Sequence, residues 1–238
     1  MWTKKQWQKT FLISLLGVAI PSLTIVRDAG NTEWSYGGST NPTNWDELNP
    51  EYKTCETGNR QSPINIQASD IGRRASGNID FNYSMSDLEV VNNGYTVKVN
   101  YDSRSSITLD GETYELKQYH FHSPSEHWVN GEAAAMELHL VHQNDAGEIA
   151  VVGVFIQSGS KNSQLAKVWS NIPGEGETKA SKTMVDASKF LPENRSYYRY
   201  SGSLTTPPCS EGVKWVLARK SHGSQSRTNR GICQSARK

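Results

Sequence analysis

The sequence predicts a single domain of mainly β structure, in the α+β class. Short segments rich in β-branched and aromatic residues follow one another along the chain, and glycine-containing turn signals separate them. The sequence contains no internal repeat and no low-complexity tract. Its 238 residues suffice for one domain with a substantial core and short terminal extensions.

The N-terminal residues 1–29 have the pattern of a secretory signal peptide. Three lysines precede an apolar run from Phe11 to Ile20, which ends at Pro21. This run is too short to span a membrane. We therefore expect export to the periplasm or the extracellular space, with no membrane span left after cleavage. An uncleaved anchor is the alternative.

Charge distinguishes the two ends of the chain from its centre. Residues 1–29 hold four basic residues and one acidic residue, and residues 219–238 hold six basic residues and no acidic one. Of the 25 basic and 24 acidic residues in total, 15 and 23 therefore fall in residues 30–218, a net charge of −8. An acidic domain argues against nucleic acid as a partner.

The domain is predicted to begin with a surface arm and to continue as strands. Residues 31–52 are rich in Asn, Gly, Pro and Trp, and Trp45 is interpreted as a packing residue. Turn signals at Asn93-Gly94, Asp110-Gly111 and Asp145-Ala146-Gly147 divide the part that follows. The elements expected are strands at Asn78–Tyr83, Leu88–Val91, Thr96–Asn100, Ser106–Leu109, Tyr114–His122, Ala134–Gln143 and Ile149–Gln157, and a short helix at Ser163–Asn171.

Three histidines on two of these strands are the candidate metal ligands. Alternation with a period of two places His120 and His122 on one face of their strand. His139 lies on the next long strand, after a turn expected near Asn130-Gly131. Three imidazoles with no fourth protein ligand form the arrangement of a catalytic zinc site. A lone histidine on such a strand is more often a hydrogen-bonded core residue.

The neighbours of these histidines favour metal binding. A metal-bound histidine commonly donates its second ring N–H to an amide or carboxylate oxygen. Gln118 lies two residues before His120, on the same face of the strand. Glu137 has the same relation to His139. The other strand histidines have no such partner in the sequence pattern and are interpreted as structural: His127 and His142.

In these segments the chain resembles the α-class carbonic anhydrases of the exported bacterial type. The similarity begins with QYHFHSPSEH (118–127) and AAAMELHLVH (133–142) and extends over about residues 33 to 217. It implies a large central twisted mixed β-sheet with short peripheral helices. It also implies reversible hydration of carbon dioxide to bicarbonate and a proton by zinc-bound hydroxide. The other segments that carry the similarity are WSYGG (34–38), NRQSPINI (59–66), NNGYTVKVN (92–100), IAVVGVF (149–155) and YSGSLTTPPCSEGVKW (200–215).

The resemblance assigns further residues to this site. The Thr205 hydroxyl would accept a hydrogen bond from the hydroxide and donate a hydrogen bond to Glu126. Thr206 would line the bicarbonate site. Without the family, the segment Thr205–Pro208 is an ordinary rigid turn. The residues implied to form an apolar carbon dioxide pocket are Val141, Val151, Leu204 and Trp215.

The three cysteines of an exported chain suggest one disulfide and one remaining thiol. Cys55 and Cys209 match the pair that is bridged in bacterial and secreted family members. The resemblance therefore implies a Cys55–Cys209 disulfide that tethers the TTPP segment beside the metal. Cys233 has no assigned role.

Two features depart from the family pattern. Tyr95 occupies the position of the usual proton-shuttle histidine, and a tyrosine with an ordinary pKa of about 10 is poorly suited to proton relay at neutral pH. Trp34 and Tyr36 match the family's aromatic pair at the rim of the site. Residues 219–238 form an atypical basic tail that we expect to be truncated or disordered. In the family, the segments that follow this point supply a backbone hydrogen-bond acceptor for one ligand histidine. The sequence therefore does not identify the hydrogen-bond acceptor of His122.

Two rival functions are retained. A cupin metal site overlaps the spacing of His120, His122 and Glu126, with the glutamate as a ligand and iron or manganese as a common metal. The cupin pattern does not account for NRQSPINI, TTPP or the cysteine pair. A carbonic-anhydrase-like binding domain without activity is the second rival, although such domains usually lose ligand histidines.

Overall fold

The computed structural model describes residues 34–72, 79–102, 104–159, 161–219 and 222–224. Its strands form two sheets. The smaller sheet consists of β1 (Asn65–Ile66), β7 (Trp128–Val129) and β8 (Glu132–Ala133). The larger, 11-stranded sheet consists of β2 (Ile79–Asn82), β3 (Ser86–Asn92), β4 (Val97–Asn100), β5 (Ser106–Leu109), β6 (Glu112–His122), β9 (Met136–Gln143), β10 (Ile149–Ser158), β11 (Thr178–Val185), β12 (Tyr197–Ser203), β13 (Glu211–Ala218) and β14 (His222–Ser224).

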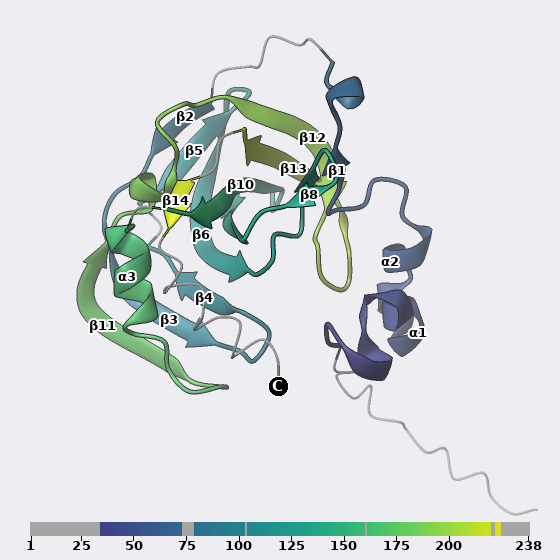
Figure 1. The fold of residues 1–238 in the computed structure, drawn as a ribbon, viewed down its shortest axis with the longest axis horizontal. Helices are drawn as coiled ribbons and strands as arrows, with labels where there is room; N and C mark the ends of the chain where they lie inside the picture. The colour runs from purple at the N-terminus through teal and green to yellow at the C-terminus, as the bar shows by residue number, and fades with distance from the viewer. Residues whose placement is uncertain (1–33, 73–78, 103, 160, 220–221, 225–238) are drawn as a thin grey trace, which may run out of the picture. The chain divides into compact units, whose positions relative to one another are not determined.

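The larger sheet is mixed (Figure 1). Its main path runs in the order β11-β3-β4-β6-β9-β10-β13-β12, with β5 joining β2 to β6. The strands β13 and β14 pair with β10 in parallel, and the other pairs are antiparallel. The prediction of a large mixed sheet in a mainly β chain is therefore confirmed.

The helices of the described residues are short. The longest, α3, follows Asn162, whose side chain accepts hydrogen bonds from the backbone N–H groups of Gln164 and Leu165 and so caps the first turn. α3 lies beside β11 (Figure 1). The helices are α1 (Trp45–Leu48), α2 (Thr54–Thr57), α3 (Ser163–Trp169) and 3₁₀ turns at Gly38–Thr40, Pro42–Asn44, Pro50–Tyr52, Ala68–Asp70 and Ala187–Phe190.

Each of the seven predicted strands is present, with ends that differ by up to two residues in the described part. The Asp110-Gly111 signal forms the turn between β5 and β6, where both residues have positive φ. The prediction did not include β11, β12 and β13. β11 is an edge strand with mostly exposed side chains, so it lacks the apolar alternation that reveals a half-buried strand.

The main hydrophobic core covers one face of the larger sheet. On β6, Tyr119 and Phe121 are buried in it, and on β9 so are Leu138 and Leu140. Leu165 and other residues of α3 and the 3₁₀ turn at 187–190 pack against this face. Because side chains alternate along a strand, burying these residues places the residues between them on the opposite face. The candidate metal ligands lie on that opposite face.

The predicted ends of the chain are described only in part. The signal peptide at residues 1–29 lies outside the described residues, as do residues 220–221 and 225–238 of the predicted tail. Within the tail, His222–Ser224 form β14, a strand that the sequence analysis did not predict. In the part of the chain that the structure describes, no helix has the length and apolar character needed to cross a membrane.

Candidate metal centre

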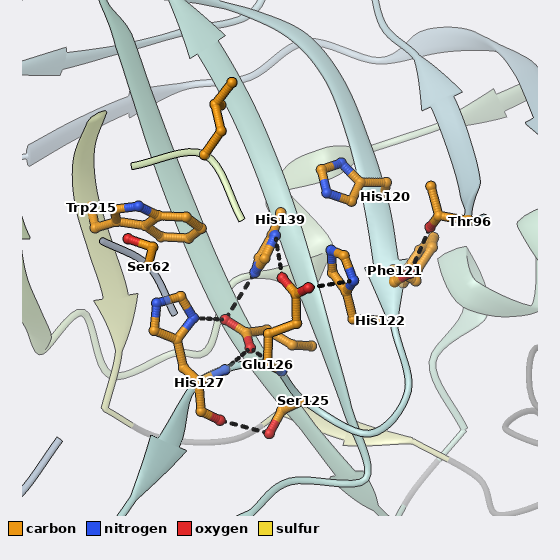
Figure 2. Close-up of polar contacts among 12 residues, drawn as sticks. Ser62, Thr96, His120, Phe121, His122, Ser125, Glu126, His127, His139 and Trp215 are labelled. Atoms are coloured by element: carbon orange, nitrogen blue, oxygen red, sulfur yellow. Dashed lines mark hydrogen bonds and ion pairs between the residues drawn. The ribbon is translucent and has the colours of Figure 1, made fainter. Parts of the chain in front are cut away.

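The register of β6 and β9 brings the three candidate histidines together. His120 lies directly opposite His139, and His122 lies opposite Glu137. The ring centroids of His120 and His122 are 5.0 Å apart, those of His120 and His139 are 5.2 Å apart, and those of His122 and His139 are 4.6 Å apart. One nitrogen from each ring lies within 4.8 Å of the others, so the group could hold one metal ion (Figure 2).

The connection between the two strands differs from the expected hairpin. Asn130 and Gly131 have positive φ and form a tight turn, as their sequence predicts. This turn joins the short strands β7 and β8, which lie between β6 and β9 along the chain. In addition, β6 has an irregularity between Leu116 and Gln118, which sets the register that pairs His120 with His139.

Acceptors on one side of each ring leave the opposite nitrogen available. Nδ1 of His120 is 2.9 Å from the amide oxygen of Gln118, and Nε2 of His139 is 3.0 Å from Oε1 of Glu137. These are the two contacts that the sequence pattern anticipated. Nδ1 of His122 lies 3.4 Å from Oε1 of Glu126, while Nε2 of His122 is buried without a hydrogen-bond partner among the described residues.

Glu137 connects the histidine group to the protein interior. Its buried carboxylate accepts hydrogen bonds from the backbone N–H groups of Glu126 at 3.0 Å and His127 at 2.9 Å. Its Oε1 is also 2.7 Å from Nδ1 of His127. Burial by itself raises the pKa of Glu137, but the adjacent His139 and His127 outweigh burial and hold it well below its ordinary value.

His127 is structural, but it does have a carboxylate partner. Alternation along a strand does not reveal Glu137 as this partner, because His127 lies in the loop after β6 and reaches Glu137 from there. Its Nε2 is 2.6 Å from the hydroxyl of Tyr200, which in turn is 2.7 Å from the hydroxyl of Ser62. His127, Glu137 and His139 form a second possible ligand group. Protein contacts already occupy both ring nitrogens of His127, so the first group is the better candidate.

The electrostatic surroundings keep two of the ligand rings neutral. Burial and the neighbouring His139 lower the pKa of His120 to about 3 and the pKa of His122 well below its usual value. For His139, burial alone lowers the pKa, but Glu137 outweighs it and the pKa is raised. Metal binding requires neutral imidazoles. The neutral state of His120 and His122 therefore suits them to metal ligation.

Glu126 is a largely buried carboxylate beside these rings (Figure 2). Burial raises its pKa to about 7, against the lowering influence of His139 and of a hydrogen bond from the hydroxyl of Thr205. A bound dication would stabilise the ionised carboxylate further. The structure thus places Thr205 and Glu126 together, at the edge of the histidine group.

The loop that carries Thr205 is tied down at both ends. The backbone N–H of Leu204 donates to the carbonyl of Ser210, and that of Cys209 donates to the carbonyl of Thr206. Cys209 forms a disulfide with Cys55, so the predicted pairing is confirmed. Thr206 is half-buried in this loop.

The predicted apolar pocket residues belong to one hydrophobic cluster on the metal-site face. Val151 and Trp215 are buried, and Val141 and Leu204 are half-buried against them. The Trp215 and His139 rings contact each other, with centroids 4.9 Å apart. The apolar cluster therefore borders the histidine group directly.

The aromatic residues Tyr36, Trp45 and Tyr95 gather around Trp34 of the N-terminal arm. Trp34 stacks on Tyr95 with ring centroids 4.5 Å apart, and Tyr36 contacts Trp34 edge-on at 5.5 Å. Trp45 is buried, as expected of a packing residue, and its indole N–H donates to the carbonyls of Ser35 and Thr40.

Gly153 is a site residue that the sequence analysis did not single out. It lies opposite His139 on β10. A Cβ atom at this position would lie 2.4 Å from the side chain of Leu217 and 3.1 Å from Oε1 of Glu137. A side chain at this position would therefore displace Leu217 and crowd the acceptor of His139. Nothing in the local sequence reveals this, because the close contacts come from other strands.

Fold and site together define a protein with a candidate three-histidine metal centre on the face of a large mixed β-sheet. The chain belongs to the eukaryotic-type carbonic anhydrase family, whose family model matches residues 40–233. This match extends into residues 219–238, which the sequence analysis interprets as an atypical basic tail.

Relatives and solved structures agree with this assignment. A carbonic anhydrase of Nostoc sp. is 40% identical over 220 residues, which cover 90% of this chain and 83% of the relative. The α-carbonic anhydrase of Thermovibrio ammonificans, solved with the inhibitor sulfanilamide, is 42% identical with a TM-score of 0.84, covering 87% of this chain and 92% of that chain. Dioscorin, solved with ascorbate, is 33% identical with a TM-score of 0.78, covering 86% and 88%.

Proposed function

We propose that this chain catalyses the reversible hydration of carbon dioxide to bicarbonate and a proton, with Zn²⁺ held by His120, His122 and His139. The observation that carries the proposal is the convergence of three ring nitrogens on the face of the sheet. The buried Nε2 of His122, which has no partner among the described residues, fits a metal ligand. Three imidazoles with an open fourth position are a donor set that suits catalytic zinc.

The polar contacts around the ligands orient them. The outer nitrogens of His120 and His139 lie 2.9 Å from Gln118 Oε1 and 3.0 Å from Glu137 Oε1, which favours the tautomer that leaves the inner nitrogen free. When bound, zinc supplies a Lewis acid that makes a nucleophile from water near neutral pH, as is general for three-histidine zinc enzymes.

Thr205 and Glu126 direct the nucleophile. The Thr205 hydroxyl donates a hydrogen bond to the Glu126 carboxylate, so its oxygen can only accept a hydrogen bond from the attacking group. That restriction aims the nucleophile's lone pair at the substrate carbon. The apolar cluster of Val141, Val151, Leu204 and Trp215 holds carbon dioxide beside His139, and Thr206 contacts bicarbonate.

Release of the proton to bulk water is expected to limit turnover, because Tyr95 occupies the shuttle position. A phenol with a pKa of about 10 accepts and releases protons poorly at pH 7, whereas an imidazole near 6.5 does both. We expect Tyr95→His to raise kcat about tenfold or more and to remove any stimulation by imidazole buffer. Stopped-flow carbon dioxide hydration with and without imidazole measures both effects.

Tyr95→Phe is the matched control, since it keeps a ring that can stack on Trp34 and removes only the hydroxyl group. Its kcat should equal that of the wild type. An unchanged kcat in Tyr95→His would show that proton release at this position does not limit turnover.

The rival functions have less support. A cupin places its metal in a barrel, whereas this chain has a large open mixed sheet and belongs to another family. A binding domain without activity has no need for a complete ligand set. Zinc analysis of the purified protein and stopped-flow carbon dioxide hydration, with and without an aromatic sulfonamide, test the proposal. One zinc per chain with sulfonamide-sensitive activity is expected, and a zinc-loaded protein without activity would contradict it.

Export to the periplasm or the extracellular space is part of this proposal. The Cys55–Cys209 disulfide supports it, because structural disulfides persist mainly in oxidising compartments. The net charge of −8 in residues 30–218 argues against nucleic acid as a partner.

A further inference from the structure

Lys98 lies in the same cross-strand row as two of the proposed ligands. On β4 it is directly opposite His120 of β6, and His120 is directly opposite His139 of β9. Directly opposed residues of antiparallel strands share one face, with Cβ atoms about 4.5–5.5 Å apart. The flanking residues Val97 and Val99 are buried in the core on the other face. Lys98 therefore projects on the metal-site face, beside His120.

Lys98 is a half-buried residue, and its ammonium has no ion-pair partner among the described residues. The carboxylates nearby have other contacts: Glu137 with His127 and His139, Glu126 with Thr205, and Glu89 of β3 with Asn100. A cation in this position disfavours a second positive charge, and Lys98 accordingly adds to burial and His139 in lowering the pKa of His120. The same cation attracts an anion.

One row of side chains on the metal-site face changes from polar to apolar along its length. One row of directly opposed residues runs from Asn100 through Gln118 to Val141, and continues to Val151 and Trp215. Along this row, polar side chains lie on β4 and β6 and apolar side chains lie on β9, β10 and β13, whereas His139 and Glu137 keep the adjacent positions of β9 polar. A neutral substrate fits the apolar half, and Lys98 supplies the charge that suits an anion on the polar half.

We propose that Lys98 is an anion-binding residue of this centre, which holds bicarbonate and other small monovalent anions next to the metal. The inference deepens the proposed function and rests on it for the identity of the natural anion. A lysine ammonium on a flexible four-carbon stem offers three donors to such a ligand. This contact is with the bound anion, so Lys98 acts on affinity and not on the chemistry of the neutral substrate.

The test compares thiocyanate binding to wild-type protein and to Lys98→Gln. In the cobalt(II)-substituted proteins, the change in visible absorption gives a dissociation constant that does not depend on turnover. We expect thiocyanate to bind about tenfold more weakly to Lys98→Gln, and the difference to shrink as ionic strength rises. Inhibition of carbon dioxide hydration by thiocyanate in the zinc proteins should weaken by the same factor.

Two further variants make the outcome specific. Lys179→Gln removes the same charge from an exposed position on β11 and should bind thiocyanate like the wild type. Lys98→Arg keeps the charge and should restore most of the affinity. Equal dissociation constants for Lys98→Gln and wild type would overturn the inference, as would an equal loss in Lys179→Gln. A protein that binds thiocyanate through Lys98 but does not hydrate carbon dioxide would refute the proposed function alone.

Discussion

Replacing His139 with asparagine is expected to lower zinc affinity by more than about 100-fold and to reduce carbon dioxide hydration to background. Loss of a hydrogen-bond partner of a metal ligand already costs about 10- to 100-fold in metal affinity, so loss of the ligand itself costs more. His139 is also the ring that faces Glu137 on one side and the centre on the other. Zinc content after dialysis and competition with a chelator measure the affinity.

His142→Asn is the matched control for this experiment. His142 is on the same strand and is also fully buried, but it faces the other side of the sheet. There its Nδ1 donates to the carbonyl of Ala150 at 3.2 Å, and its Nε2 lies 2.8 Å from the hydroxyl of Tyr83. Leaving such buried groups unpaired costs about 1–3 kcal/mol, so this variant should melt at a lower temperature yet keep one zinc per chain.

The pair of variants separates ligation from folding. Loss of zinc in both would indicate that the metal is lost through general destabilisation. Retention of wild-type zinc affinity in His139→Asn, with a cooperative melt, would refute the ligand assignment.

Removing the Cys55–Cys209 disulfide is expected to lower the free energy of unfolding by up to about 5 kcal/mol. The bridge joins residues 154 positions apart in the sequence, and in the chain-entropy model a crosslink stabilises by restricting the unfolded chain over such a loop. Small domains are typically stable by about 5–15 kcal/mol, so this loss is a large fraction of the total. Urea unfolding of the Cys55→Ser/Cys209→Ser double variant under non-reducing conditions measures it.

The bridge is also expected to matter for the site. It connects α2 to the loop that carries Thr205 and Thr206, where Gln61 additionally donates to the carbonyl of Cys209. The double variant should therefore lose kcat even at temperatures where it remains folded. Cys233→Ser removes a thiol without touching the bridge and should change neither quantity. Equal unfolding free energies for double variant and wild type would contradict the predicted stabilisation.

The local pattern of the sequence was a good guide wherever a single strand decides the outcome. Alternation on β6 and β9 predicted which side chains share a face, and the burial of Tyr119 and Leu138 in the core on the opposite face agrees with it. Turn signals such as Asp110-Gly111 predicted where the chain reverses. β11 was missed because it is an edge strand whose exposed side chains leave no apolar period to read.

The contacts between strands required the tertiary structure. Only the register of β4, β6 and β9 places Lys98 in one row with His120 and His139. Likewise, His127 reaches Glu137 from a loop, so no sequence period relates the two residues.

The sequence by itself therefore determined which residues share a face of a strand and, through family resemblance, the pairing of Cys55 with Cys209. Tertiary structure alone decided which faces meet, what a side chain at position 153 would displace, and where the charge of Lys98 lies. The physical reason is that alternation is a property of one strand's backbone, which local sequence specifies. Register between strands is set by hydrogen bonds and packing among segments far apart in the chain.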